Sequence, residues 1–95
     1  MTRYTVVWDA QVESHFIDAW IACDSQSRAV LTEIANWVDG NLADDPDQKG
    51  QSRDDLSVRI LAVPVSNSTA RVSVTYQVLP EDRQVRVVRL VIRAL

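Results

Sequence analysis

A chain of 95 residues with a mass of 10.7 kDa has the size of one domain, and we expect residues 1–95 to form a single domain. The composition, 46% hydrophobic and 24% charged, is that of a globular protein and excludes a disordered chain. A net charge of -3 argues against a protein that binds nucleic acid indiscriminately.

The first half of the chain predicts one strand and two helices. Residues 4–8 are aromatic and β-branched, which favours a strand. Asp9 stands at a helix N-cap position, and the spacing of the following apolar residues predicts a helix over roughly 10–23. A second helix is expected to be capped by Ser25 or Ser27 and to end at Gly40-Asn41. The short connection predicts an antiparallel hairpin, with Trp20 and Trp37 packed between the helices.

The second half of the chain predicts a polar loop followed by three strands. Residues 44–55 form the loop, and residues 56–63, 70–79 and 85–92 form the strands, with a turn at 80–83. Apolar and polar residues alternate along 70–79, so this strand has one buried face and one solvated face. The predicted fold is α+β with the order β-α-α-β-β-β. Its N-terminal helical hairpin packs on one face of a mainly antiparallel four-stranded sheet.

The sequence predicts no metal site, cofactor or membrane partner. The single cysteine, Cys23, and the single histidine, His15, cannot supply the clustered ligands of a zinc site. The loop aspartates lack the glycine and glutamate positions of a calcium loop, so we interpret them as solvated: Asp44, Asp45, Asp47, Asp54 and Asp55. No apolar run approaches the ~18 residues of a membrane span, and no signal peptide is recognised. We therefore expect a cytoplasmic protein.

Charge is divided unevenly along the chain. Residues 1–55 carry eleven acidic and four basic residues, hence -7, whereas residues 56–95 carry six arginines and two acidic residues, hence +4. Two interpretations remain open: the C-terminal part contacts an anionic partner, or the two parts of the chain attract each other.

The order of these elements, with several residues along them, resembles the RelE/ParE superfamily, the toxin halves of bacterial type II toxin-antitoxin pairs. The resemblance covers the whole chain. It rests on residues 4–8 with Ala10, on Asp45-Pro46 with Gly50, on Arg59 in the second strand, on residues 74–78, and on the closing strand with Val85, Val87, Leu90 and Arg93.

The resemblance implies a toxin of the plasmid-stabilisation type that inhibits growth and is neutralised by a cognate antitoxin, whose C-terminal segment wraps around it. ParE-like members of the superfamily inhibit DNA gyrase, whereas RelE-like members cut mRNA in the ribosome. If the chain is an enzyme, the resemblance therefore implies an endoribonuclease.

The residues themselves argue against the nuclease. Cleavage of RNA at its 2′-hydroxyl needs a proton acceptor, a proton donor and positive charge, and arginine supplies only the charge. The candidates for catalysis are Arg59, Arg71, Arg93 and the sole lysine, Lys49. Tyr76 falls on the apolar face of its strand and is interpreted as core, and His15 as a helix-surface residue. The usual proton-transfer residues are therefore missing, which favours a toxin that acts by binding.

The arginines of the predicted strands are the candidates for contact with the target or the antitoxin. They are Arg59, Arg71, Arg86, Arg89 and Arg93. Arg89 and Arg93 share one parity along the last strand and Arg86 has the other, so a cluster on one sheet face remains an alternative to simple solvation. Three functions stay open: a toxin that binds a macromolecule, a ribosome-dependent endoribonuclease, and a degenerate interaction module of the same fold.

Overall fold

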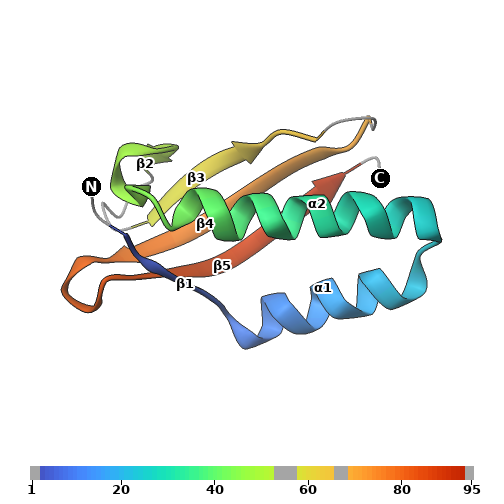
Figure 1. Cartoon of the computed structure of the whole chain (residues 1–95), viewed down its shortest axis with the longest axis horizontal. Helices are drawn as coiled ribbons and strands as arrows, with labels where there is room; N and C mark the ends of the chain where they lie inside the picture. The colour runs from blue at the N-terminus through green and yellow to red at the C-terminus, as the bar shows by residue number, and fades with distance from the viewer. Residues whose placement is uncertain (1–2, 53–57, 66–68, 94–95) are drawn as a thin grey trace.

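Two helices cover one face of a five-stranded sheet in the computed structural model (Figure 1), which describes residues 3–52, 58–65 and 69–93. The elements are β1 (Thr5–Trp8), α1 (Ala10–Ala22), α2 (Ser25–Leu42), a 3-10 helix (Pro46–Gln48), β2 (Gln51–Ser52), β3 (Val58–Val63), β4 (Arg71–Leu79), a 3-10 turn (Pro80–Asp82) and β5 (Gln84–Arg93). The predicted α+β architecture and element order are confirmed. Asp54, Asp55 and the predicted strand start at Leu56 lie outside the described residues.

The fifth strand, β2, is absent from the predicted fold, as is the 3-10 helix that precedes it in the predicted loop. β2 consists of two residues inside the predicted loop, where Gln51 pairs with Ile60 and Ser52 with Arg59. Two residues are too few to show a strand pattern, so only the pairing with β3 identifies this strand.

The first helix begins at Ala10 with Asp9 as its N-cap, as predicted, because the carboxylate of Asp9 accepts a hydrogen bond from the backbone N–H of Gln11. The second helix starts and ends at residues that differ from the predicted ones. The carboxylate of Asp24, one residue before the predicted caps, accepts a hydrogen bond from the backbone N–H of Ser27 at 2.8 Å. This hydrogen bond also lowers the pKa of Asp24 below its ordinary value. At the other end, α2 continues through Gly40 because the side chain of Leu42 is fully buried. The predicted caps at Ser25 or Ser27 and the predicted end at Gly40-Asn41 are therefore wrong.

The sheet has the strand order β1-β5-β4-β3-β2, in which only β1 and β5 are parallel. β1 pairs with only the first four residues of β5, from Gln84 to Val87. The pairing of β4 with β5 contains a bulge: Tyr76 lies opposite Val87 and Thr75 lies opposite Arg89, so Val88 is one extra residue on β5.

The core lies between α2 and the sheet. α2 buries Leu31, Ile34, Val38 and Leu42 against the inner-face residues of β4 and β5, among which Tyr76, Val74, Val85 and Val87 are fully buried. α1 lies alongside α2 at the β5 side of the sheet (Figure 1) and contributes no buried residue. α2 is therefore the helix on which the core depends.

The prediction that Trp20 is a core residue of the helical hairpin is wrong. Its side chain is 39% exposed, and the guanidinium of Arg28 stacks over its ring at 4.7 Å from the centroid. Arg28 also donates hydrogen bonds to the carbonyl oxygens of Trp20 and Ile21, the last turn of α1. Arg28 therefore caps the C-terminal end of α1 and connects the two helices of the hairpin. Trp37 is half-buried against the core, as predicted.

Neither helix in the described part of the chain combines the length and hydropathy that crossing a membrane requires.

Trp8 connects β1 to both helices. Its indole N–H donates a hydrogen bond to the carboxylate of Asp39 on α2 at 2.8 Å, and its ring contacts the ring of Phe16 on α1 edge-on, with 5.4 Å between the centroids. Trp8 is therefore a half-buried structural contact.

Truncating the two helices at matched isoleucines should give unequal losses of stability. Ile34→Ala removes a fully buried side chain of α2 and should lower the free energy of unfolding by about 2 to 5 kcal/mol. Ile17→Ala removes a side chain of α1 that is 47% exposed and should cost less than about 1 kcal/mol. Urea unfolding of both variants tests this difference, and equal losses would contradict the assignment of the core to α2.

Candidate functional site

The face of the sheet opposite the helices carries four exposed arginines, which we call the basic face: Arg71, Arg86, Arg89 and Arg93. Residues directly opposite each other on neighbouring antiparallel strands point to the same face. Arg71 of β4 lies opposite Arg93 of β5, and the other two arginines lie opposite Thr75 and Gln77 of β4, which alternate with the buried residues. Neither strand contains an acidic residue, so no carboxylate of β4 or β5 offsets the charge of the four arginines.

The β-bulge brings Arg86 onto the basic face. In a regular strand, residues 86 and 89 point to opposite faces. Because Val88 is an extra residue on β5, the alternation shifts by one position between Val87 and Arg89. The prediction that Arg86 faces away from Arg89 and Arg93 is therefore wrong, and three arginines of β5 line up on one face.

Arg59 does not belong to the basic face. It lies opposite the buried Tyr76 and so points to the face of the sheet that the helices cover. Its Nε donates a hydrogen bond to the carbonyl oxygen of Lys49 at 2.6 Å, and its Nη2 donates to that of Gly50 at 3.2 Å. Arg59 therefore holds the loop after α2 against β3.

Tyr76 is the buried anchor of the same loop. Its side chain is fully buried, and its hydroxyl lies 2.9 Å from the carbonyl oxygen of Pro46 and 2.8 Å from that of Lys49, so its single hydrogen is shared between them. Gly50 has a φ of 67°, and a Cβ there would lie 2.5 Å from the carbonyl oxygen of Ile60. The loop therefore needs glycine where it meets β3. The interpretation of Tyr76 as a core residue is confirmed.

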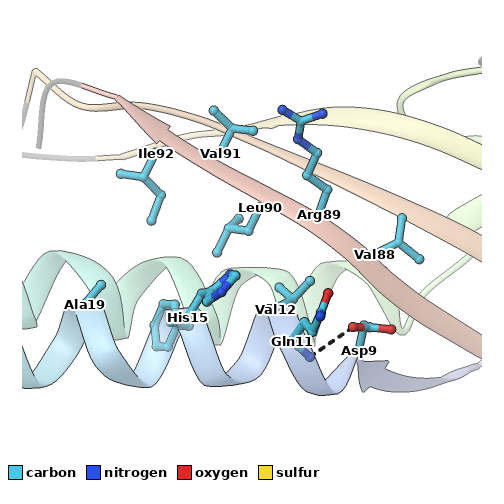
Figure 2. A pocket seen from close by; sticks show the side chains of 11 residues that line it. Asp9, Gln11, Val12, His15, Ala19, Val88, Arg89, Leu90, Val91 and Ile92 are labelled. Carbon is cyan, nitrogen blue, oxygen red and sulfur yellow. Dashed lines mark hydrogen bonds between the residues drawn. The ribbon is translucent and has the colours of Figure 1, made fainter.

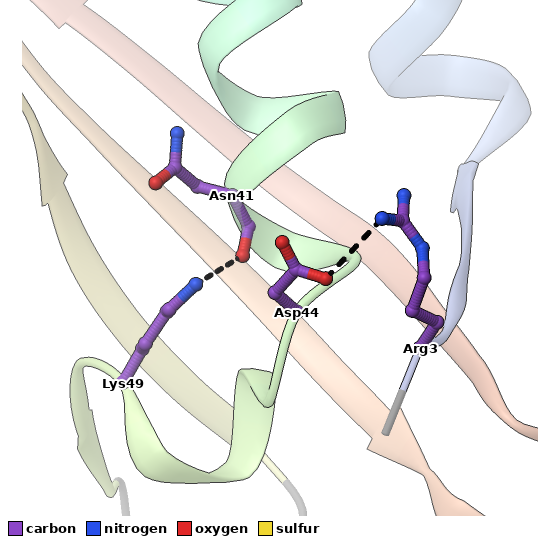
Figure 3. Close-up of polar contacts among 4 residues, drawn as sticks. All are labelled: Arg3, Asn41, Asp44 and Lys49. Atoms are coloured by element: carbon purple, nitrogen blue, oxygen red, sulfur yellow. Dashed lines mark hydrogen bonds and ion pairs between the residues drawn. The ribbon is translucent and has the colours of Figure 1, made fainter. Parts of the chain in front are cut away.

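Lys49, the sole lysine, is held in the same group of contacts, which we call the loop anchor: Tyr76 and Arg59 with the loop residues Pro46, Lys49 and Gly50. Figure 3 shows its ammonium donating to the carbonyl oxygen of Asn41, at 2.5 Å, near the end of α2. In the same view Arg3, just before β1, pairs with Asp44 after α2, with 3.6 Å between Nη1 and Oδ1. The structure thus brings two of the four candidate catalytic residues, Arg59 and Lys49, to the loop anchor, and the other two to the basic face.

Burial raises the pKa of Tyr76 above its ordinary value of 10.0, and the nearby charge of Arg59 offsets part of this effect. The hydroxyl therefore stays protonated at neutral pH and acts as a hydrogen-bond donor. On the basic face, the polar neighbours on β4 are Ser73, Thr75 and Gln77, none of which exchanges a proton near neutrality. The described part of this face can bind anions but has no group for general acid-base chemistry.

A groove of about 540 Å³ lies on the other side of β5, between this strand and α1. Figure 2 shows Leu90 and Ile92 pointing from β5 toward α1, whereas Arg89 and Val91 point to the opposite face. Val12, Phe16 and Ala19 form the apolar wall on α1, and Asp9, Gln11 and His15 add polar groups.

The sequence reasoning missed this groove. The sequence feature that could have indicated the groove is the difference in length between the first predicted strand, of five residues, and the last, of eight. When a short strand pairs with a longer one, part of the longer strand is left without a partner.

Among the described residues, no group of three or more potential metal ligands is close enough to hold a metal ion.

Comparison with solved structures finds two similar structures, and both align with nearly the whole chain. The first is the toxin-antitoxin complex RelBE2 from Mycobacterium tuberculosis, at a TM-score of 0.65 and 19% identity, covering 100% of this chain and 97% of that one. The second is an arginine mutant of the E. coli toxin RelE in the free state, at a TM-score of 0.60 and 15% identity, covering 95% of this chain and 82% of that one.

The chain therefore has a RelE/ParE-like fold, as the sequence resemblance implies. No protein-family model matches the sequence. No curated protein matches it either.

Replacing Tyr76 by phenylalanine should weaken the loop anchor while leaving the ring in the core. Loss of the hydroxyl leaves the carbonyl oxygen of Pro46 without this donor and should cost about 1 to 3 kcal/mol of stability. The variant should also change the response to alkaline pH. Because the pKa of Tyr76 is raised on folding, its contribution is complete below pH 10.0 and declines as the pH rises through the folded pKa.

Urea unfolding between pH 8 and 11 measures both effects. Wild type should lose stability above pH 10.0 more steeply than Tyr76→Phe. Tyr4 is present in both proteins and serves as the internal control. Identical alkaline slopes would show that the Tyr76 hydroxyl titrates alike in the folded and unfolded chain.

Proposed function

We propose that residues 1–95 form a single toxin domain of a type II toxin-antitoxin system of the plasmid-stabilisation type. In this proposal the protein works in the cytoplasm, inhibits growth by binding a macromolecular target, and is neutralised by a cognate antitoxin. The observation that carries the proposal is the basic face: four exposed arginines on one face of β4 and β5, with no proton-transfer group beside them among the described residues. The RelE-like fold supports it, since one of the similar structures is a toxin-antitoxin complex.

The electrostatics of this face suit an anionic partner. Arginine side chains bind carboxylates and phosphates through charge-assisted, often bidentate, hydrogen bonds. A cluster of one sign raises the rate at which an oppositely charged partner arrives. An acidic antitoxin segment and an anionic surface of the target would therefore compete for the same arginines, and such competition is a direct way to neutralise a toxin.

A ribosome-dependent endoribonuclease remains the second candidate, because Arg71 and Arg93 lie opposite each other and form a pair able to hold a phosphate. Against it, Arg59 and Lys49 donate to backbone carbonyls of the loop anchor. A scissile phosphate on the basic face would therefore lack two of the four residues proposed for its catalysis. DNA gyrase and ribosome-bound mRNA are the two targets that the fold family suggests, and a degenerate interaction module is the third candidate function.

Expression of the chain alone in a bacterial host should arrest growth while translated messages stay intact. The reason is that the basic face supplies binding but no proton transfer. Primer extension on abundant transcripts, taken during the arrest, measures cleavage. Cuts at defined codon positions would favour the endoribonuclease, and the absence of any arrest would favour the degenerate module.

Neutralising the basic face should slow association with the proposed cognate antitoxin. Arg71→Gln, Arg89→Gln and Arg93→Gln together should lower the association rate about tenfold and flatten its dependence on salt, because the steering field is lost. The equilibrium loss should be modest, since an exposed charge pair is worth only about 0.2 to 1 kcal/mol.

The matched control is Gln26→Glu, Asn36→Asp and Gln48→Glu, which lowers the net charge by the same amount through exposed residues of α2 and the 3-10 helix. Stopped-flow binding at several salt concentrations compares the two triple variants. If both variants slow association equally, net charge and not the basic face controls the rate.

A further inference from the structure

Half of β5 has an unpaired edge. β1 ends at Trp8, opposite Val87, so residues 88–93 have no neighbouring strand on that side among the described residues. The backbone N–H and C=O groups along this edge that point away from β4 are hydrogen-bonding groups without a strand partner. Such an edge is a template for a further strand, which would lie about 4.8 Å from β5.

The groove beside this edge is apolar on the helix side. Val12 and Ala19 of α1 face Leu90 and Ile92 of β5 across it (Figure 2), and Phe16 of α1 also lines the groove. α1 has no buried residue in the free protein, and Val88 at the bulge is 37% exposed. The helix and the strand therefore present apolar surface to a segment that would lie between them.

The opposite side of the same edge is basic. Arg89 and Arg93 point to the basic face, away from α1 (Figure 2 shows Arg89), because they alternate with Leu90 and Ile92. Side chains of an added strand also alternate between the two faces. One half of them would contact the groove, and the other half would lie beside the two arginines. Cross-strand pairs of opposite charge stabilise a sheet, whereas like charges weaken it.

These three observations exclude two other occupants. A second copy of the chain paired edge to edge through β5 would set arginines against arginines. RNA lacks the amide edge that would complete the backbone hydrogen bonds of a sheet, and it has no side chains for the apolar wall of the groove.

We propose that residues 88–93 of β5 accept an extended partner segment as a sixth strand of the sheet, and that this segment alternates apolar residues, which enter the groove against α1, with acidic residues, which face Arg89 and Arg93. The inference rests on the proposed function, because it names the chemistry of the antitoxin segment that neutralises the toxin. It also places part of that segment in the groove, in addition to the basic face.

A synthetic ten-residue peptide tests the proposal on the purified full-length chain. Its six central residues alternate valine and glutamate, with Ser-Gly at each end for solubility, and the control peptide alternates valine and lysine. The valine-glutamate peptide should bind at least tenfold more tightly by fluorescence anisotropy. It should also slow hydrogen exchange at least tenfold at those amides of residues 88–93 that face the unpaired edge, without slowing exchange at Val85, which β1 already covers.

Two sets of variants separate the groove from the charge. Ala19→Phe fills the groove and should weaken the valine-glutamate peptide at least tenfold, whereas Ala22→Phe, on the same helix but outside the groove, should not. Arg89→Glu with Arg93→Glu should reverse the preference and select the valine-lysine peptide. This exchange of preference does not depend on whether Ala19→Phe folds.

Three results would overturn the proposal: no binding of the valine-glutamate peptide, equal binding of both peptides by the wild type, or protection of amides outside residues 88–93. Tighter binding of a single-stranded RNA of equal length at the same edge would do so too. The peptide experiment uses purified protein, so its outcome is independent of growth arrest. If the chain arrests growth but does not bind the peptide, the proposed function stands and this inference fails. If the chain binds the peptide but does not arrest growth, the strand-binding edge stands and the proposed function fails.

Discussion

The buried hydroxyl of Tyr76 is the constraint around which the rest of this fold is arranged. A phenol with no exposed surface needs a hydrogen-bond partner, and the partners here are two backbone carbonyls of the loop after α2. Once the loop is held there, the carbonyl of Lys49 also receives Arg59, and the ammonium of Lys49 reaches the end of α2. One hydroxyl thus connects β4, β3, the loop and the core helix. It also explains why the two basic residues nearest to it serve the scaffold.

The rest of the positive charge is organised by backbone geometry. One extra residue, Val88, sets three arginines of β5 on the same side as Arg71 of β4, while Leu90 and Ile92 keep their places on the apolar side. The strand therefore has a basic face and an apolar face along its whole length, although its sequence does not alternate throughout. β1 stops before the bulge, so both faces meet at an edge that is open to a partner.

The fold could be predicted from periodicity, because α2 and β4 repeat at 3.6 and 2.0 residues and bury the residues that the pattern selects. The site was only partly predictable. The arginines of β4 and β5 were recognised as candidates, but their common face depends on the bulge, which no local signal announces. The placement of Arg59 depends on its register opposite Tyr76, a contact between residues far apart in the sequence. Trp20 fits the apolar stripe of α1 by spacing, but its ring packs under Arg28 near the surface.

The attachment of α1 has a consequence for how long the free chain survives in a cell. A helix that buries no residue is held by half-buried contacts such as the one between Trp8 and Phe16, so it can detach locally at a lower free energy than the whole domain needs to unfold. Proteases act on such locally opened states, and their rate follows the open population. A ligand that packs against α1 lowers that population by mass action. Turnover of the protein would therefore be governed by the docking of one helix, well before the core itself is disturbed.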